Sequence, residues 1–293
     1  MLSSSKRFVL TPILAKSFLP LTFGNLIQEI RALFNRLVIQ SYRRFSFLLA
    51  GLIQPLLWLI LFGSLFQNFI FPAFSNKIVY YDNFLSPGVI VFTAFTSSLN
   101  AGLPIMFDRE FGFFNRLLAV PMTSRLSIVV ASFCHIVCVT TVQMLTIWFI
   151  TMTKDKIYIS INFSIIFYNT LMLLLLICFV TVLSIVLAFV LSGHIELLAL
   201  ILIINLPILF SSTALAPLTF MPKWLQLVAT LNPLTYPIEA LRYTLMSDEF
   251  CVSQKTIVTM FGQLSVIDII FSFFLLNFLM FFAANYFFHT KLE

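Results

Sequence analysis

Six long apolar runs, separated by short polar segments, dominate the pattern of the chain. Only the sixth run contains an Asp, Glu, Lys or Arg residue, namely Asp268, which lies near one end of it. Each run exceeds the ~20 residues that a helix needs to cross a bilayer, and none alternates with the period of two that a membrane β-strand requires. The pattern predicts an all-α, polytopic membrane protein with transmembrane helices at about residues 45–71, 84–107, 126–150, 163–191, 197–218 and 264–288.

The segment before the first run has two parts. Residues 1–24 are basic, rich in Ser and free of acids, which favours a cytoplasmic or stromal tail, although a cleaved transit peptide would look similar. In residues 25–44, apolar side chains recur at helical spacing opposite a polar face, which predicts an amphipathic helix in the headgroup plane. The recurring apolar residues are Leu26, Ile30, Leu33 and Leu37, joined on the same face by Ile27, Phe34 and Val38. This helix is either an anchor or a contact for a partner, and residues 45–293 form the transmembrane domain.

Composition agrees with this class, since 60% of the residues are hydrophobic and 10% are charged, against about 25% charged in soluble domains. The 36 Phe residues are typical of proteins encoded by AT-rich organelle genomes.

With six spans, 11 of the 17 basic residues fall on the side of both termini. The positive-inside rule therefore places the termini and the segment 108–121 in the cytoplasm or stroma. The net charge of +6 reflects this topology, and no nucleic-acid partner is expected.

A dense charge cluster lies between the second and third runs. It comprises Asp108, Arg109, Glu110, Gly112 and Arg116 and ends at Pro121. A short charged segment between two spans must lie at the membrane surface, either as a tight loop or as a handle for a soluble partner. Asp108 and Glu110 also suit the start of a helix. The segment is therefore interpreted as a helix cap alone, or as a cap that also docks a partner.

Catalytic and metal-binding motifs are scarce. Cys134, His135 and Cys138 lie together on a span, but metal or haem binding would need more ligands, so buried small hydrophobic side chains explain the cysteines better. No Walker A motif occurs, so another polypeptide must bind ATP if ATP drives this protein. The first five runs lack the ionisable groups that couple ions to transport. The sequence predicts no enzyme activity and no cofactor within this chain.

Four segments, in this order, resemble those of ABC-2 type transporter permeases, especially permeases of red-algal plastids and cyanobacteria. They are Gln54–Trp58, Phe84–Gly88, Asp108–Pro121 and the stretch from Pro222 to Arg242. The resemblance covers roughly residues 25–290, and one departure is Asn115, where relatives often carry an acid. It implies a half-transporter with two permease subunits, identical or similar, and two separate ATPase subunits.

The resemblance also implies roles for two groups of residues. The segment after Asp108 would dock into the ATPase as a coupling helix, with Phe111, Phe113 and Phe114 as anchors and with charged residues fixing the register. Those charged residues are Arg109, Glu110 and Arg116. Short re-entrant helices before the last span would seal the outer mouth, and structural closure is favoured there over substrate contact. The residues of this outer signature are Asn232, Pro233, Glu239 and Arg242.

Taken together, these features predict a membrane permease subunit that is driven by a separate ATPase. The lack of charge in the spans favours a lipid-like, glycan or hydrophobic substrate, and the resemblance implies that it is exported, with membrane lipid as the surrounding partner. The alternative is a non-transporting membrane assembly or biogenesis factor. The expected location is a plastid membrane, with a bacterial plasma membrane as the alternative.

Overall fold

The structure is a computed structural model that describes most of the chain. The described residues are 23–43, 45–68, 70–72, 78–119, 126–154, 163–246, 252–254, 257–259 and 262–292. The predicted tail therefore lies outside the described residues apart from its last two positions, and so do Arg44, Pro121 and Arg125.

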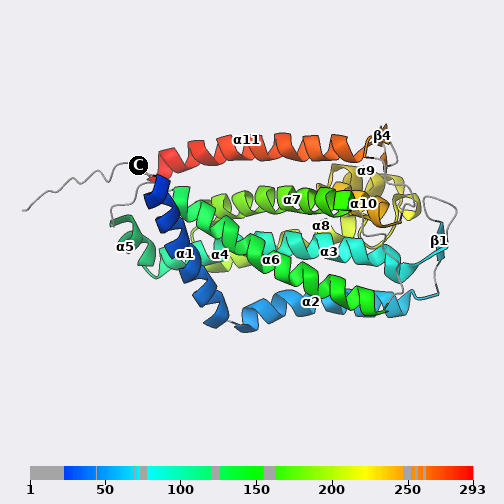
Figure 1. The fold of residues 1–293 in the computed structure, drawn as a ribbon, viewed down its shortest axis with the longest axis horizontal. Helices are drawn as coiled ribbons and strands as arrows, with labels where there is room; N and C mark the ends of the chain where they lie inside the picture. The colour runs from blue at the N-terminus through cyan, green and yellow to red at the C-terminus, as the bar shows by residue number, and fades with distance from the viewer. Residues whose placement is uncertain are drawn as a thin grey trace, which may run out of the picture.

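Six of the described helices are long and apolar enough to cross a membrane, which confirms the predicted all-α, polytopic class. They lie lengthwise, side by side, in Figure 1. The second crossing is built from three consecutive elements, α3, η1 and α4. The bounds are α2 Phe45–Leu65, α3 Tyr81–Leu99, η1 Asn100–Gly102, α4 Leu103–Glu110, α6 Leu126–Lys154, α7 Phe163–Val190, α8 His194–Ser211 and α11 Val266–Leu292.

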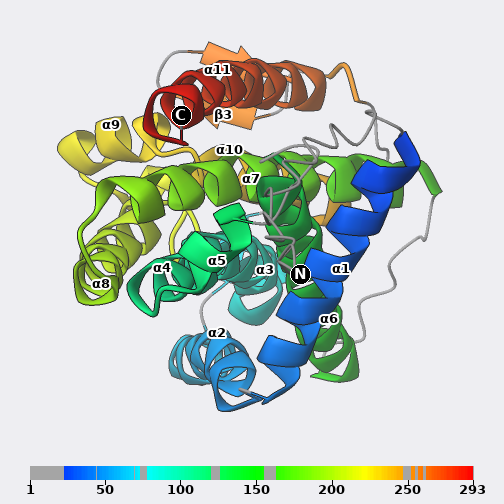
Figure 2. The same ribbon diagram turned by 90° about the vertical axis from the view of Figure 1, so that its left-hand side faces the viewer.

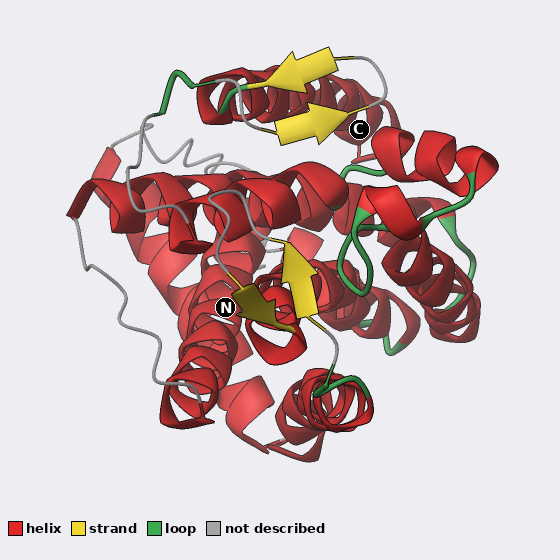
Figure 3. Ribbon diagram, turned by 90° about the vertical axis from the view of Figure 1, so that its right-hand side faces the viewer, coloured by secondary structure: helices red, strands yellow, loops and turns green. Residues whose placement is uncertain are grey.

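The shorter elements gather at the two ends of this bundle. One end holds α1 (Phe23–Arg43), α5 (Phe113–Ala119) and the end of α11, as Figure 2 shows. The opposite end holds η2, α9, α10 and two short antiparallel hairpins, whose strands are drawn in Figure 3. These elements are η2 Leu218–Phe220, α9 Lys223–Leu231, α10 Thr235–Met246, β1 Ile70–Pro72, β2 Ile78–Tyr80, β3 Ile257–Thr259 and β4 Gly262–Leu264. Hereafter they are the α5 end and the α10 end.

The first hairpin corrects one predicted boundary. The first apolar run was expected to remain helical to residue 71, but α2 ends at Leu65, and Ile70–Pro72 pairs with β2 so that Phe71 lies opposite Val79. Pro72 cannot continue a helix, and the β-branched residues of β2 favour a strand. The apolar composition was read correctly, but it did not distinguish a helix end from an edge strand.

The second crossing is the centre of the bundle. Between Tyr81 and Glu110, 83% of the span is buried inside the protein, against 17% for the spans in α2 and α11. Small residues allow this close approach. A Cβ atom on Gly88 would lie 2.8 Å from the backbone of Ala214, so at this point only glycine lets α3 touch the segment that follows α8.

The last crossing has few protein neighbours. It packs mainly along α7, where Phe273 is buried and Asn277 donates a hydrogen bond of 2.9 Å to the carbonyl of Leu175. Other Phe side chains of α11, such as Phe271 and Phe274, remain exposed on the protein surface. In a bilayer such apolar positions contact lipid, which is how so many Phe residues are accommodated without a large protein core.

The amphipathic segment forms α1, which lies across the α5 end and packs mainly against α6. Leu37, on the predicted apolar face, is buried, and Leu33 is half-buried. Ile27 and Val38 were also assigned to that face, yet both are exposed. The apolar stripe is therefore wider than the contact with α6, and its outer edge is free to lie in the headgroup region.

Candidate functional site

The charged block lies at the end of the second crossing. Its helix, α4, begins after Gly102 with Pro104 in the first turn and continues through Glu110, and the chain then turns at Gly112, whose φ is +73°. The interpretation of Asp108 as a helix cap was wrong, because Asp108 lies in the last turn of α4. The preceding apolar residues already belong to this helix, so the acids fall at its C-terminal end, where the helix dipole disfavours them.

Asp108 is compensated by a cation from another element. It forms an ion pair with Arg36 of α1, and the Arg36 guanidinium also lies 4.1 Å from the centre of the Phe113 ring. The pair thus joins α1, α4 and α5. A cation over an aromatic face adds an attraction of about 0.5–1 kcal/mol at exposed sites.

The next two residues bind the ends of two other crossings. Arg109 donates hydrogen bonds to the carbonyls of Ala188 and Leu191, where α7 ends, the second at 3.3 Å. Glu110 accepts a hydrogen bond of 2.6 Å from the backbone N–H of His194, the first residue of α8, and also pairs with its imidazole. A cation at a helix C-terminus and an anion at an N-terminus both match the helix dipole. Both side chains therefore serve contacts inside this chain.

Three aromatic side chains follow, and they divide into two groups. Phe114 is 6% exposed and packs edge-on against Phe189 of α7 at 5.6 Å between ring centres. Phe111 and Phe113 are 75% and 39% exposed, and Arg116 is exposed as well. Phe114, predicted as an anchor for a partner, instead fixes α5 to the bundle. The remaining outward surface consists of Phe111, Phe113 and Arg116, called the α5 surface below.

The break in the second crossing was not foreseen from the sequence. At η1, the N–H of Gly102 donates a 3.0 Å hydrogen bond to Ser184 Oγ of α7, and the Ser184 hydroxyl in turn donates to the carbonyl of Leu99. A Cβ atom on Gly102 would lie 2.5 Å from the Ser184 carbonyl oxygen. Short 3₁₀ segments within helices often mark hinges. The run Asn100-Ala101-Gly102 followed by Pro104 was the available sign.

The α10 end is built around the predicted outer signature. Asn232 donates hydrogen bonds of 2.7 Å to the carbonyl of Ile208 and 2.9 Å to Ser211 Oγ, while its Oδ1 accepts from the N–H of Leu234 at 2.9 Å. Pro233 favours the extended backbone seen at Asn232 and so separates α9 from α10. One amide side chain thus joins the end of α8 to the start of α10.

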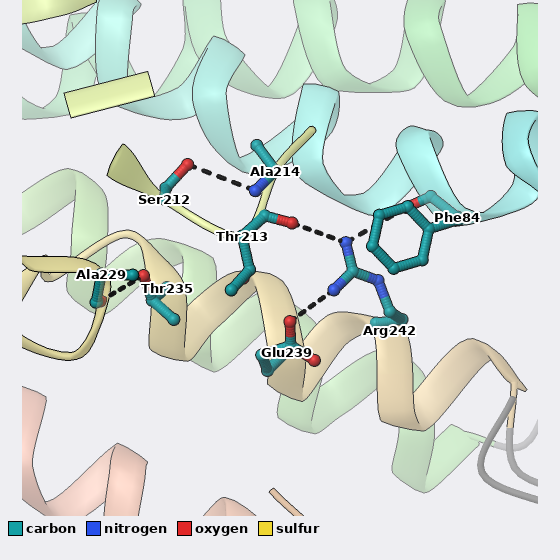
Figure 4. A network of polar contacts seen from close by, with 8 residues as sticks. All are labelled: Phe84, Ser212, Thr213, Ala214, Ala229, Thr235, Glu239 and Arg242. Atoms are coloured by element: carbon teal, nitrogen blue, oxygen red, sulfur yellow. Dashed lines mark hydrogen bonds and ion pairs between the residues drawn. The ribbon is translucent and has the colours of Figure 1, made fainter. Parts of the chain in front are cut away.

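Arg242 lies at the centre of a second network, drawn in Figure 4. Its guanidinium pairs with Glu239 and donates hydrogen bonds to the carbonyls of Phe84 at 3.2 Å and Thr213 at 3.0 Å. It also lies 3.6 Å from the centre of the Phe84 ring. Burial lowers the pKa of Arg242, and the Glu239 carboxylate opposes that shift. The network ties α10 to the first turn of α3 and to the segment after α8.

The sulfur and imidazole groups of α6 make no cluster. His135 Nε2 lies 2.7 Å from Ser41 Oγ of α1, Cys134 is half-buried and Cys138 is exposed. Within the part of the chain that the structure describes, no three His, Cys, Asp or Glu side chains are placed to hold a metal ion. That the chain carries no cofactor stays a prediction.

Comparisons with known proteins agree with this architecture. A family model described as ABC-2 type transporter matches residues 28–246. The chain belongs to this family. It is 49% identical over 266 residues to "Putative transport permease ycf38" of Porphyra purpurea, covering 91% of this chain and 90% of that protein. The protein of the same name from Pyropia yezoensis is 49% identical over 261 residues, with 89% of each chain covered.

A third relative with that name, from Cyanophora paradoxa, is 46% identical over 261 residues, which cover 87% of this chain and 88% of the relative. The relatives come from red algae and a glaucophyte, and together with the six apolar helices they confirm the predicted location. The chain is a multi-pass membrane protein of the plastid, and it is a permease subunit of a transporter.

Proposed function

We propose that the chain is the membrane subunit of an ATP-driven exporter, which works as a dimer with separate ATPase subunits docked on the α5 surface. The observation that carries this proposal is the exposed aromatic pair Phe111, in the turn after α4, and Phe113, the first residue of α5. Aromatic side chains exposed together beside a basic residue such as Arg116 are typical centres of protein interfaces.

The contacts behind the α5 surface suit force transmission. Asp108 joins α4 to α1, Arg109 joins it to the end of α7, and Glu110 joins it to the start of α8. Movement of α5 and α4 would therefore reach three other elements at once. When the ATPase pair closes on ATP, such a movement would tilt the crossings about η1, the break held by Ser184.

The α10 end is the part of the bundle that stays fixed while α4 and α5 move. The buried Arg242 network joins α10, α3 and the segment after α8, which supports structural closure of the outer mouth over direct substrate contact. A transporter of this design would load substrate at the α5 end and release it once the closed end separates.

The surface of α2 and α8 supports dimer formation. Only 17% and 22% of their spans are buried within this chain, and their exposed side chains are apolar, including Leu57, Leu61, Leu202 and Ile203. A second permease subunit would cover such a face, and the remainder would contact lipid. The scarcity of charge in the crossings supports a substrate that is lipid-like, a lipid-linked glycan or otherwise hydrophobic.

The test is capture of the ATPase by matched variants. Phe111→Ser with Phe113→Ser should weaken binding of the plastid ABC ATPase subunit by about 30-fold, as expected when interface aromatics are lost. Phe220→Ser changes an aromatic residue of similar exposure, 68% against 75% for Phe111, at the α10 end and should have no effect. Binding would be measured by co-purification and by stimulated ATP hydrolysis in nanodiscs.

Equal binding by both variants would remove the α5 surface as the docking site. A wild-type chain that binds no ABC ATPase at all would favour the assembly-factor alternative.

A further inference from the structure

A cavity lined by both polar and apolar groups lies in the α5-end half of the bundle. Its volume is about 510 Å³, and its walls come from the end of α1, the first half of α2, the η1 region, α6 and the start of α8. Small-molecule pockets usually measure about 300–1,000 Å³. Four amide side chains line it: Gln40, Gln54, Asn100 and Gln143. It lies within one subunit and is separate from the α5 surface.

Several of these polar groups have unused hydrogen-bonding capacity. Gln40 Oε1 is buried without a partner, and the side chains of Gln54 and Asn100 make no hydrogen bond with the described part of the chain. By contrast, Gln143 accepts from Ser97, and His135 is paired with Ser41. A buried acceptor without a partner, such as Gln40 Oε1, is costly, whereas Asn100 is half-buried and Gln54 is exposed, so their amide groups are accessible to a ligand. A bound molecule with several hydroxyl groups would satisfy them.

The lining also carries no formal charge from Asp, Glu, Lys or Arg. A phosphate placed there would lose its hydration without gaining a cation, which is strongly unfavourable. Amide groups offer both donors and acceptors, as the hydroxyl groups of a sugar do. The lining therefore selects a neutral, hydroxyl-rich group over an anionic one.

The apolar walls indicate that the ligand has a second, hydrophobic part. Leu48 of α2 and Leu198 of α8 line the cavity on facing helices, together with Phe107. Farther toward the α10 end, the same two helices meet where the rings of Trp58 and Phe210 lie 5.8 Å apart. The cavity thus lies between the start of α2 and the start of α8, and the two helices touch farther along at Trp58 and Phe210, so a headgroup in the cavity would leave its tail along these helices.

We propose that this cavity binds the neutral sugar headgroup of a glycolipid, which is the molecule that the transporter exports. This inference rests on the proposed function, for which it names the substrate class.

The test uses the full-length chain in phosphatidylcholine nanodiscs, prepared without glycoside detergents because these would compete. The probe is dioctanoylglycerol carrying one hexose, and the comparison ligand is dioctanoyl phosphatidylglycerol. Equilibrium binding of the hexosyl lipid should weaken at least about tenfold in Gln54→Leu with Asn100→Leu, since two hydrogen bonds are lost. Thr146→Val removes an exposed hydroxyl of α6 outside the cavity and should bind as the wild type does.

A second variant keeps the test interpretable if the double variant of Gln54 and Asn100 fails to fold. Gly51 lines the cavity, and a Cβ atom there would lie 2.8 Å from Nε2 at the end of the Gln143 side chain. Gly51→Leu should therefore fill the cavity and abolish binding while the helix is retained, as thermal unfolding will check. Equal binding of both lipids, or undiminished binding by Gly51→Leu, would overturn the inference.

Capture of the ATPase separates this inference from the proposed function. A chain that captures the ATPase but does not bind the hexosyl lipid refutes the sugar site and leaves the exporter in place. Selective lipid binding by a chain that captures no ATPase supports the site and refutes its role in export.

Discussion

The two ends of the bundle hold their charges in different ways. At the α5 end, the side chains of Arg36 and Asp108 are 29% and 15% exposed, and those of His194 and Glu110 are 33% and 26% exposed. At the α10 end, the Arg242 side chain is only 3% exposed and has a carboxylate, two carbonyls and an aromatic face around it.

This difference separates contacts that can rearrange from contacts that cannot. Partly exposed ion pairs contribute about 0–1 kcal/mol, because water competes for both partners. Removing one partner of a buried pair costs about 3–5 kcal/mol, because a charge is left uncompensated. The α5 end is therefore suited to movement, whereas the α10 end is suited to holding helices in fixed positions.

The largest effect is expected from Arg242→Met. It leaves the mostly buried Glu239 (13% exposed) without its cation and removes the buried donors to Phe84 and Thr213, so stability should fall by about 3–5 kcal/mol. Thermal unfolding in nanodiscs measures this, with exposed Lys223→Met as the matched control. Adding Glu239→Leu should recover much of the loss. An Arg242→Met protein that is stable but transports a different substrate would contradict the closure role.

A smaller loss is expected at the hinge. In Gly102→Ala the new methyl group would lie 2.5 Å from the Ser184 carbonyl oxygen, so η1 and α7 must separate at a cost of about 1–3 kcal/mol. Gly24→Ala in α1 is the control, because a Cβ atom there meets nothing within 4 Å. If both variants unfold at the same temperature, then the close contact at Gly102 does not limit stability.

The smallest change in stability is expected for Asp108→Asn. It removes the charge that pairs with Arg36 yet preserves the size of the side chain, so stability should change by less than about 1 kcal/mol. Transport per ATP hydrolysed should nevertheless decline, because α1 is no longer held to α4. A loss of stability as large as that of Arg242→Met would show that the two ends do not differ as described.

Much of this architecture was predictable because the bilayer imposes it. Uninterrupted apolar runs can only be buried in lipid or protein, so the six crossings followed from the sequence, whereas the short helices around Asn232-Pro233 were implied by the family resemblance. The cap assigned to Asp108 failed because a preference for helix starts is weak, and the run Leu103–Phe107 already formed the helix that contains it. The hairpin at Ile70–Pro72 was missed because short apolar segments suit either structure.

Side-chain partners were beyond the reach of sequence reasoning. Arg109 and Glu110 were assigned to an external partner, and their intramolecular contacts with α7 and α8 appear only once those helix ends are adjacent. Likewise, Gln40 and Asn100 are separated by the first crossing and share a cavity wall only after folding. The pairing of Glu239 with Arg242 could be read from their spacing, but their burial could not.

The order of apolar and charged residues by itself determined the class of the protein, its crossings and the surface position of the charged block, because the cost of placing charge in hydrocarbon acts on each segment separately. The tertiary structure alone decided which ion pairs are buried and which are partly exposed to water. It also decided which amide side chains without partners line the same cavity. Those properties depend on the distance and solvent exposure of groups far apart in the chain, which no local pattern encodes.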